Sequence, residues 1–314
     1  MGAHHNEPML ESKCQKRGGT GCNLSCRCSL VIVKDFAYFN GRLTNLNEMT
    51  IPMNDRAVFF GDGVYEVVYV RNGLCFALDD HVNRFFSSLR LLEIRPPMSQ
   101  ESLKNLLKEL IGKLDKGMRD VCLYFQCTRG TALRSHAFPD SSIPPNLLIY
   151  AHAFLNMLHK EFRLISAEDR RFGYCHIKSL NLIPNVLATQ RAVEAGADEC
   201  VLHRGEVVME CAHSGLSILK NGKIITSPLN EWILPSITRK HLLQIGLRLG
   251  IQVEERPYMM DELMSADEVI ITSSLTLLSR AYEIDGQPIG GKDLSLFGRI
   301  DDTYMNWFHI ETEE

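Results

Sequence analysis

The dipeptide Asn72-Gly73 imposes a tight β-hairpin on this chain of 314 residues. Both residue types accept the positive φ angles that a two-residue hairpin turn requires, and apolar runs flank them at 64–70 and 74–78. Directly after the hairpin, the spacing of apolar residues changes from the two-residue repeat of strands to the 3.6-residue repeat of helices. A hairpin followed by helices predicts an α+β chain.

Two amphipathic helices are predicted after the hairpin. The first follows the capping candidates Asp79 and Asp80, and the second follows Ser99. Their apolar residues recur at intervals of three and four: Val82, Phe85, Phe86 and Leu89 in the first, and Leu103, Leu106, Leu107, Leu110, Ile111 and Leu114 in the second. Strands are predicted at 121–126 and 147–151, joined by a long polar connection over 128–139. Connections of that length are often functional.

The second half of the chain is predicted to run strand, helix, hairpin, helix and strand. The predicted elements are a short strand-like run at 174–177, a helix at 184–196, a helix between Pro235-Ser236 and Gly250, and a buried strand at 269–271. Turn dipeptides predict three more hairpins, at Arg204-Gly205, Asn221-Gly222 and Asp285-Gly286.

The length of the chain predicts two domains, because single hydrophobic cores stop growing near about 250–300 residues. Hydrophobic residues make up 45% of the chain, which is enough to fill a core in each domain. The pattern divides the chain into an N-terminal extension over 1–30, a small domain over 31–150, a linker over 151–157 and a large domain over 158–314.

Charge and hydropathy exclude several kinds of partner. The formal net charge is -4, and Lys and Arg are interspersed with Asp and Glu, so we expect no nucleic-acid partner. No apolar run approaches the roughly 18–20 residues that cross a bilayer, so we expect no membrane association. The first residues lack the apolar core of a secretory signal, and we expect a cytoplasmic location.

The ten cysteines form two groups. Six lie in apolar segments, where we expect reduced, buried thiols: Cys75, Cys122, Cys127, Cys175, Cys200 and Cys211. Four lie in a polar stretch before the first predicted strand: Cys14, Cys22, Cys26 and Cys28. Their spacing does not match the paired C-x2-C arrangement of common zinc sites, so we expect a poorly ordered extension without a metal.

Lys178 is the first candidate for chemistry. Lysine is rarely fully buried unless it is paired or used, yet Lys178 lies among apolar residues. The ordinary interpretation is a surface lysine at a strand end. The functional one is a desolvated amine that attacks an aldehyde. A phosphate on such a cofactor would need anion sites, and the sequence offers these: the backbone N–H groups of Ile237 and Thr238 at a helix start, the hydroxyls of Thr238, Ser273 and Ser274, and the guanidinium of Arg84.

Further side chains are suited to handling charge. Glu210 ends an apolar strand, where a carboxylate needs a positive partner such as a pyridinium nitrogen or an arginine. Arg134 and His136 lie two residues apart in the long connection, in a spacing that suits binding a carboxylate but that solvated loop charges also show. Tyr65 lies in the strand before the hairpin, where it either donates its hydroxyl to the same carboxylate or packs in the core.

In their order and amino-acid sequence, these segments resemble those of the fold-type IV pyridoxal-phosphate enzymes, and among them the D-amino-acid aminotransferases. The resemblance runs from about residue 36 to 310. Its segments are FGDGVYEVV at 60–68, HVNR at 81–84, YFQCTRG at 124–130, RSH at 134–136, IKSLN at 177–181, Glu210, ITR at 237–239 and TSS at 272–274.

The resemblance implies a cofactor, pyridoxal 5′-phosphate, and a role for each candidate. Lys178 would form a Schiff base with the cofactor and carry the proton, and Glu210 would pair with the pyridine nitrogen. Tyr65, Arg134 and His136 would hold the substrate carboxylate, the last two reaching in from the partner subunit of a homodimer. The phosphate would be bound by Arg84, Ile237, Thr238 and Ser274. The implied reaction is transamination between D-amino acids, such as D-alanine, and 2-oxo acids, such as 2-oxoglutarate, in a two-domain α+β fold.

One segment departs from the family, and three alternatives stay open. Where relatives follow the glutamate with a run of Gly and Ser ending in Asn, this chain has Cys211-Ala212-His213-Ser214-Gly215, which affects substrate range and turnover more than cofactor binding. A branched-chain L-aminotransferase would not need the Arg134 and His136 pair. An aminodeoxychorismate-type lyase would use the same lysine to eliminate pyruvate. A pyridoxal-phosphate-binding protein with little turnover is supported by the altered segment alone.

Overall fold

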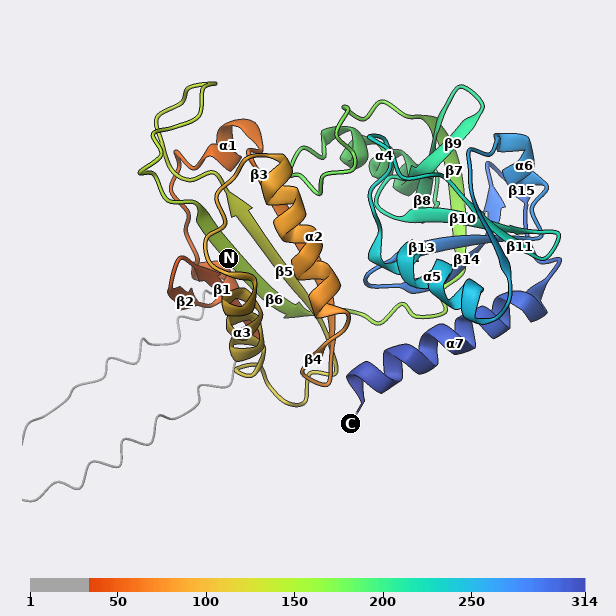
Figure 1. The fold of residues 1–314 in the computed structure, drawn as a ribbon, viewed down its shortest axis with the longest axis horizontal. Helices are drawn as coiled ribbons and strands as arrows, with labels where there is room; N and C mark the ends of the chain where they lie inside the picture. The colour runs from red at the N-terminus through yellow and green to blue at the C-terminus, as the bar shows by residue number, and fades with distance from the viewer. Residues whose placement is uncertain (1–33, 314) are drawn as a thin grey trace, which may run out of the picture. The chain divides into compact units, whose positions relative to one another are not determined.

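The computed structural model describes residues 34–313, which form two β-sheets with helices packed against them, as Figure 1 shows. The predicted α+β class is therefore confirmed. The predicted extension over 1–30 and its four cysteines lie outside the described residues. Among residues 34–313, no helix combines the length and the apolar character needed to cross a bilayer.

The first sheet is antiparallel and has the strand order β2-β1-β6-β5-β3-β4. Its strands are β1 (Asp35–Phe39), β2 (Arg42–Thr44), β3 (Gly63–Arg71), β4 (Leu74–Cys75), β5 (Asp120–Thr128) and β6 (Asn146–Ala153). The associated helices are η1 (Leu46–Glu48), α1 (Arg56–Phe60), α2 (Leu78–Leu91) and α3 (Gln100–Ile111). Apolar residues of α2 and α3, such as Phe85 and Leu107, form one buried cluster with strand residues such as Val68.

The local signals of this half are confirmed in two places and wrong in a third. Asn72-Gly73 joins β3 to β4 with φ angles of 53° and 81°. Ser99 caps α3 by accepting a hydrogen bond from the Ser102 N–H. The predicted caps of α2 are wrong: Ala77, with a left-handed φ of 51°, precedes the helix, and Asp79 and Asp80 lie in its first turn. Because β4 has only two residues, the chain turns into the helix at once.

The second sheet is mixed and has the order β12-β11-β10-β13-β14-β7-β8-β9, with β15 paired to β14. Its strands are β7 (Phe162–Glu168), β8 (Glu199–Arg204), β9 (Val207–Cys211), β10 (Gly215–Lys220), β11 (Lys223–Thr226), β12 (Gln252–Glu255), β13 (Glu268–Ser273), β14 (Leu277–Ile284) and β15 (Gln287–Pro288). Its helices are α4 (Ile183–Glu194), α5 (Ile237–Arg248), α6 (Met260–Met264) and α7 (Leu294–Thr312).

The turns and helix ends of this half lie where the sequence predicts them. The three predicted hairpins join β8 to β9, β10 to β11 and β14 to β15. Pro184 lies at the start of α4, Ser236 caps α5, and both helices are followed by a glycine with positive φ, Gly196 and Gly250. The predicted buried strand is β13.

The strand-like run predicted at 174–177 is wrong. The segment forms a turn in which the Ile177 N–H donates to the Tyr174 carbonyl at 2.9 Å, and Tyr174 has a φ of 73°. Only Ile177 enters the buried cluster of the first sheet, while Tyr174 is exposed. Because this apolar run is buried at Ile177 alone, it does not show the alternating burial of a strand.

One apolar cluster joins residues from both sides of the predicted linker. Tyr69 and Phe76 of the first half contact Phe308 of α7, each with ring centres 5.0 Å apart. The strand β6 extends to Ala153, and β7 begins at Phe162. By their contacts, all of the described residues belong to one unit. The division into two domains at 151–157 stays a prediction.

Candidate active site

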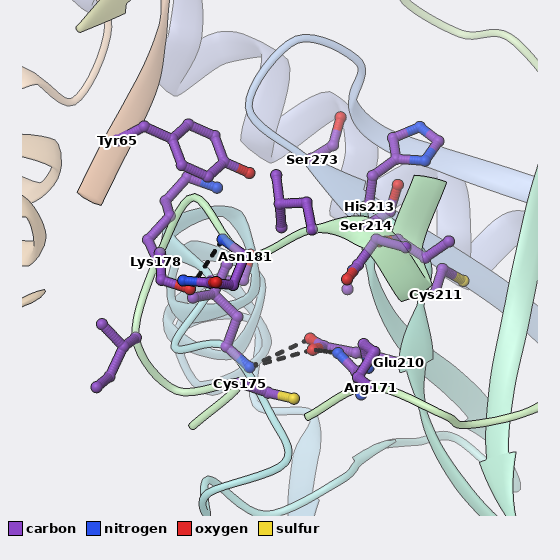
Figure 2. Close-up of a pocket in the computed structure, with 18 of the residues that line it drawn as sticks. Tyr65, Arg171, Cys175, Lys178, Asn181, Glu210, Cys211, His213, Ser214 and Ser273 are labelled. Carbon is purple, nitrogen blue, oxygen red and sulfur yellow. Dashed lines mark hydrogen bonds and ion pairs between the residues drawn. The ribbon is translucent and has the colours of Figure 1, made fainter. Parts of the chain in front are cut away.

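A cavity of about 400 Å³ is lined by residues from both halves of the chain. Its walls come from β3, α2, the segment 171–182, α4, the turn after β9, the residues before α5 and the end of β13, and Figure 2 shows its polar side chains. Ligand sites commonly have volumes of about 300–1,000 Å³. The cavity is therefore large enough for a small cofactor with its substrate.

Lys178 is held at this cavity by backbone pairing with β3. The Tyr65 N–H donates to the Lys178 carbonyl at 3.0 Å, and the Leu180 N–H donates to the Gly63 carbonyl at 3.0 Å. The Lys178 Nζ lies 4.3 Å from the centre of the Tyr65 ring, and both side chains lie together in Figure 2. The main chain of Lys178 is thus fixed, while its amine is part of the cavity wall.

Two glycines of the FGDG segment permit this close approach. Gly61 ends α1 with a φ of 60°, a conformation that glycine adopts without strain. A Cβ atom on Gly63 would lie 2.7 Å from the Cys127 carbonyl oxygen and 2.8 Å from Leu180 Cδ1. Any side chain at position 63 would therefore clash with the β5 backbone and crowd the Leu180 side chain, two residues from Lys178.

Arg84 lines the cavity from α2 and is bound by a buried carboxylate. Its Nε and Nη2 donate to Glu66 at 2.7 and 2.8 Å, and its Nη1 donates to the Pro235 carbonyl at 3.1 Å. His81 Nδ1 lies 2.8 Å from the same carboxylate. Burial raises the pKa of Glu66, but Arg84 and His81 outweigh that effect and lower it to about 2. Arg84 is accordingly a fixed cation in the cavity wall.

Small polar groups gather where α5 begins beside the end of β13. Ser236, Thr272, Ser273 and Ser274 line the cavity, and the Thr238 hydroxyl donates to the Ser273 carbonyl at 3.0 Å. The Thr272 Oγ1 is buried and has no hydrogen-bond partner within residues 34–313. An unpaired buried hydroxyl beside a helix N-terminus and Arg84 fits an anionic group such as a phosphate.

Glu210 lines the cavity at the end of β9 and is paired with Arg171. Arg171 Nη1 binds the Glu210 carboxylate, and Arg171 Nε and Nη2 each donate to Asp169 at 3.0 Å. The Leu234 N–H lies 3.3 Å from both Glu210 oxygens. Burial raises the pKa of Glu210, and the charge of Arg171 counteracts this without reversing it. Figure 2 shows the pair at the opposite end of the view from Tyr65.

The segment 211–215, for which the sequence resemblance predicts a departure from the family, also lines the cavity. His213 Nδ1 lies 2.8 Å from Glu199 Oε2, and Ser214 Oγ donates to the same oxygen at 2.8 Å. The His213 side chain is 55% exposed, whereas that of Glu199 is fully buried. The His213 imidazole is therefore held in the cavity wall by its contact with Glu199.

Arg134 and His136 do not line this cavity. Both are exposed and pack against Phe60, with the Arg134 guanidinium carbon 5.2 Å and the His136 ring centre 5.3 Å from the Phe60 ring centre. The buried Arg56 donates from Nη1 to the carbonyls of Ser135 and Ala137 at 2.8 and 3.2 Å. The loop thus has a defined position, with both side chains outside the cavity of their own chain.

Six of the candidate residues line the cavity: Tyr65, Arg84, Lys178, Glu210, Ser273 and Ser274. Ile237 and Thr238 follow the cavity residue Ser236 in the chain but do not line the cavity themselves. The sequence interpretation missed four polar groups that line the cavity or bind its residues: Glu66, Arg171, Glu199 and Thr272. Glu66 had a usable signal, because it is an acid inside an apolar strand, whereas nothing local distinguishes Arg171 from the other charges at 168–171.

Similar proteins share both sequence and fold with this chain. Residues 63–284 match the protein family described as amino-transferase class IV. The D-alanine aminotransferase of Bacillus licheniformis is 40% identical over 256 residues, which cover 80% of this chain and 89% of that protein. The D-alanine aminotransferase of Staphylococcus aureus (strain N315) is 35% identical over 257 residues, covering 80% and 90%. The structure of a branched-chain amino acid aminotransferase from T.th., complexed with N-(5′-phosphopyridoxyl)-L-glutamate, has a TM-score of 0.77 and 26% identity, covering 88% and 94%.

Proposed function

The chain belongs to the class IV aminotransferases and is a pyridoxal-phosphate-dependent enzyme, and we propose that it transfers amino groups between D-amino acids and 2-oxo acids. The observation that carries the substrate class is the 40% identity to a D-alanine aminotransferase across 80% of the chain. The segment Arg134-Ser135-His136 supports the same class, because its two cationic side chains are suited to binding a substrate carboxylate.

Pyridoxal phosphate supplies an aldehyde that an amine can attack and a ring that withdraws electrons from the substrate α-carbon. We propose that the Lys178 amine binds the aldehyde, which its place in the cavity wall supports. Arg84, the Ser274 hydroxyl and the backbone N–H groups of Ile237 and Thr238 are proposed to bind the phosphate. A fixed cation, a helix N-terminus and the Thr272 hydroxyl, which is unpaired within residues 34–313, support an anion at this end of the cavity.

We propose that Lys178 also moves the proton. With cofactor and substrate bound, the free and unprotonated Lys178 amine would accept the substrate α-proton and would later donate a proton to complete the transfer. The backbone pairing with β3 and the Tyr65 ring hold the amine on one side of the cavity. Because one amine can reach only one face of the bound substrate, the amino acid consumed and the amino acid formed are expected to have the same chirality. The kinetics are expected to be ping-pong.

Glu210 is proposed to hold the proton on the pyridine nitrogen. A carboxylate has about four acceptor sites, so the contacts with Arg171 and the Leu234 N–H leave capacity for another donor. Burial raises the pKa of Glu210, and the charge and hydrogen bond of Arg171 limit that rise without reversing it. A protonated ring nitrogen stabilises the negative charge that develops when the α-proton leaves.

We propose a homodimer in which the loop bearing Arg134 and His136 enters the cavity of the second copy. Neither residue lines the cavity of its own chain, and Arg56 holds the loop in place. The same loop exposes Leu133 and Phe138 by 88% and 58%, which is apolar surface that a partner would cover. Arg134 and His136 would then bind the α-carboxylate, with the Tyr65 hydroxyl donating from the cavity's own chain.

We also propose the two-domain division at 151–157 and a cytoplasmic location. Separate apolar clusters on the first and second sheets support the division. Free thiols support a reducing compartment, and the six cysteines of the described range are all free: Cys75, Cys122, Cys127, Cys175, Cys200 and Cys211.

The choice of amino donor tests the proposal, with 2-oxoglutarate as the acceptor. Pyruvate formed from D-alanine is compared with the 2-oxo acid formed from L-leucine. D-alanine is expected to be the better donor, and Lys178→Ala serves as the inactive control. A preference for L-leucine would favour the branched-chain L-aminotransferase, which the 26% identical structure keeps as the second candidate. Pyruvate release from aminodeoxychorismate would favour the lyase, and bound cofactor without turnover would favour a binding protein.

A further inference from the structure

His213 lines the cavity and has a ring nitrogen that the proposed function leaves unused. The residue follows β9, lines the cavity, and lies on the other side of Figure 2 from Lys178 and Tyr65. Its Nδ1 is engaged by Glu199 at 2.8 Å. Its Nε2 has no hydrogen-bond partner in the part of the chain that the structure describes. A side chain that is 55% exposed at a cavity wall can bind a ligand without further opening.

The partner of His213 favours a protonated imidazole. Glu199 is fully buried, and a buried carboxylate requires a compensating charge. Within residues 34–313, the basic side chain that forms an ion pair with Glu199 is His213. Burial lowers the pKa of His213, but the hydrogen bond and charge of Glu199 outweigh this and raise the pKa overall. A protonated imidazole donates from both nitrogens, so His213 has an Nε2–H left to donate after Nδ1 has bound Glu199.

The imidazole is not needed to attach the turn to the sheet. The backbone N–H of His213 and the Ser214 hydroxyl already donate to Glu199 Oε2, at 3.3 and 2.8 Å. The Cys200 N–H donates to Glu199 Oε1 at 2.8 Å. These contacts do not depend on the side chain at position 213. What histidine adds there is a cationic donor in the cavity wall.

The other cations of the cavity wall already have partners or roles. Arg84 is bound to Glu66 and is proposed to bind the phosphate. Arg171 is bound to Glu210, and Lys178 is proposed to bind the aldehyde. The proposed loop of the second copy binds the substrate α-carboxylate. His213 is therefore available for a second negative charge on the substrate.

We propose that His213 is a specificity-determining residue, which binds the side-chain carboxylate of a dicarboxylic amino acid or 2-oxo acid through its Nε2–H. The inference rests on the proposed function, from which it takes the binding of the α-carboxylate elsewhere. Two separate cationic groups match the two charges of a dicarboxylate. A monocarboxylic substrate such as D-alanine leaves His213 unused.

Binding of acids that cannot react tests this directly. The pyridoxal-phosphate-loaded protein is titrated by calorimetry at neutral pH with glutarate, and with valerate, which has the same chain length and one carboxylate. His213→Gln replaces the imidazole by a neutral amide, and His213→Ser replaces it by a small neutral hydroxyl. His203→Gln is the matched control, because the His203 ring of β8 bonds to the Gly205 carbonyl at 2.7 Å and does not line the cavity.

We expect the glutarate affinity to fall about tenfold or more in both His213 variants, as the loss of a hydrogen bond to a charged group predicts. The valerate affinity, and both affinities of His203→Gln, should stay at the wild-type value. Unchanged glutarate binding, absent glutarate binding in the wild type, or equal losses for glutarate and valerate would each overturn the role of His213.

Turnover of D-alanine by the same preparations separates this inference from the proposed function. If the wild type does not use D-alanine, but the His213 variants bind glutarate more weakly than the wild type does, the D-amino-acid proposal fails and the carboxylate site stands. If D-alanine is used and glutarate binding is independent of His213, the carboxylate site alone fails.

Discussion

Replacing Glu66 by glutamine should leave a buried guanidinium without its counterion. Glu66 is fully buried and accepts two hydrogen bonds from Arg84, at 2.7 and 2.8 Å. Despite burial, Arg84 and His81 lower its pKa from 4.5 to about 2, which corresponds to about 3 kcal/mol. Removing one partner of a buried ion pair costs about 3–5 kcal/mol. We therefore expect Glu66→Gln to lower the free energy of unfolding by about that amount.

The effect should depend on pH in a defined direction. A carboxylate whose pKa is lower in the folded than in the unfolded protein stabilises the fold above the unfolded pKa, and this contribution is lost as the pH falls. For Glu66 the loss occurs between pH 4.5 and about 2. The difference in stability between wild type and Glu66→Gln should thus be largest near neutral pH and should narrow as the pH falls below 4.5.

Urea unfolding of the cofactor-free proteins, followed by circular dichroism at neutral pH, measures the difference. Glu101→Gln is the control, because Glu101 forms an exposed ion pair with Lys104, and such pairs contribute at most about 1 kcal/mol. Added inorganic phosphate should stabilise Glu66→Gln more than the wild type, since it can supply the missing counterion of Arg84. If Glu66→Gln were no less stable than Glu101→Gln, the buried pair would not stabilise this end of the cavity.

Three substitutions test the proposed roles of the site. Lys178→Ala should abolish the visible absorbance of the lysine-bound cofactor and reduce turnover by several orders of magnitude, and a retained absorbance band would contradict its role. Glu210→Gln should still bind the cofactor but slow removal of the α-proton, measured as exchange with deuterated solvent; a wild-type rate would show that ring protonation does not depend on Glu210. Arg134→Ala should raise the KM for D-alanine by roughly ten- to a hundredfold without changing the absorbance spectrum. Mixing Arg134→Ala with Lys178→Ala subunits should restore part of the activity, and no recovery would argue against a site shared between subunits.

Local structure could be predicted wherever neighbours in the chain decide it. The Asn72-Gly73 turn and the helix starts at Ser99 and Ser236 depend on φ angles and on donors within a few residues, and all three are found as predicted. The start of α2 and the turn at 174–177 were predicted wrongly, because a short strand and a single buried anchor, Ile177, override the local pattern.

The amino-acid sequence was enough to locate Lys178, Glu210, Arg84 and Ser274 as candidates for chemistry, because each lies in a segment that resembles a motif of a known family. The contacts of these groups depend on the tertiary structure. Glu66 with Arg84, Arg171 with Glu210, and Glu199 with His213 are pairs that form because the path of the chain brings distant charges together in a buried place. No local pattern encodes that path, since the free energy of an ion pair depends on the distance between the charges and on their exclusion from water, and both are set by packing.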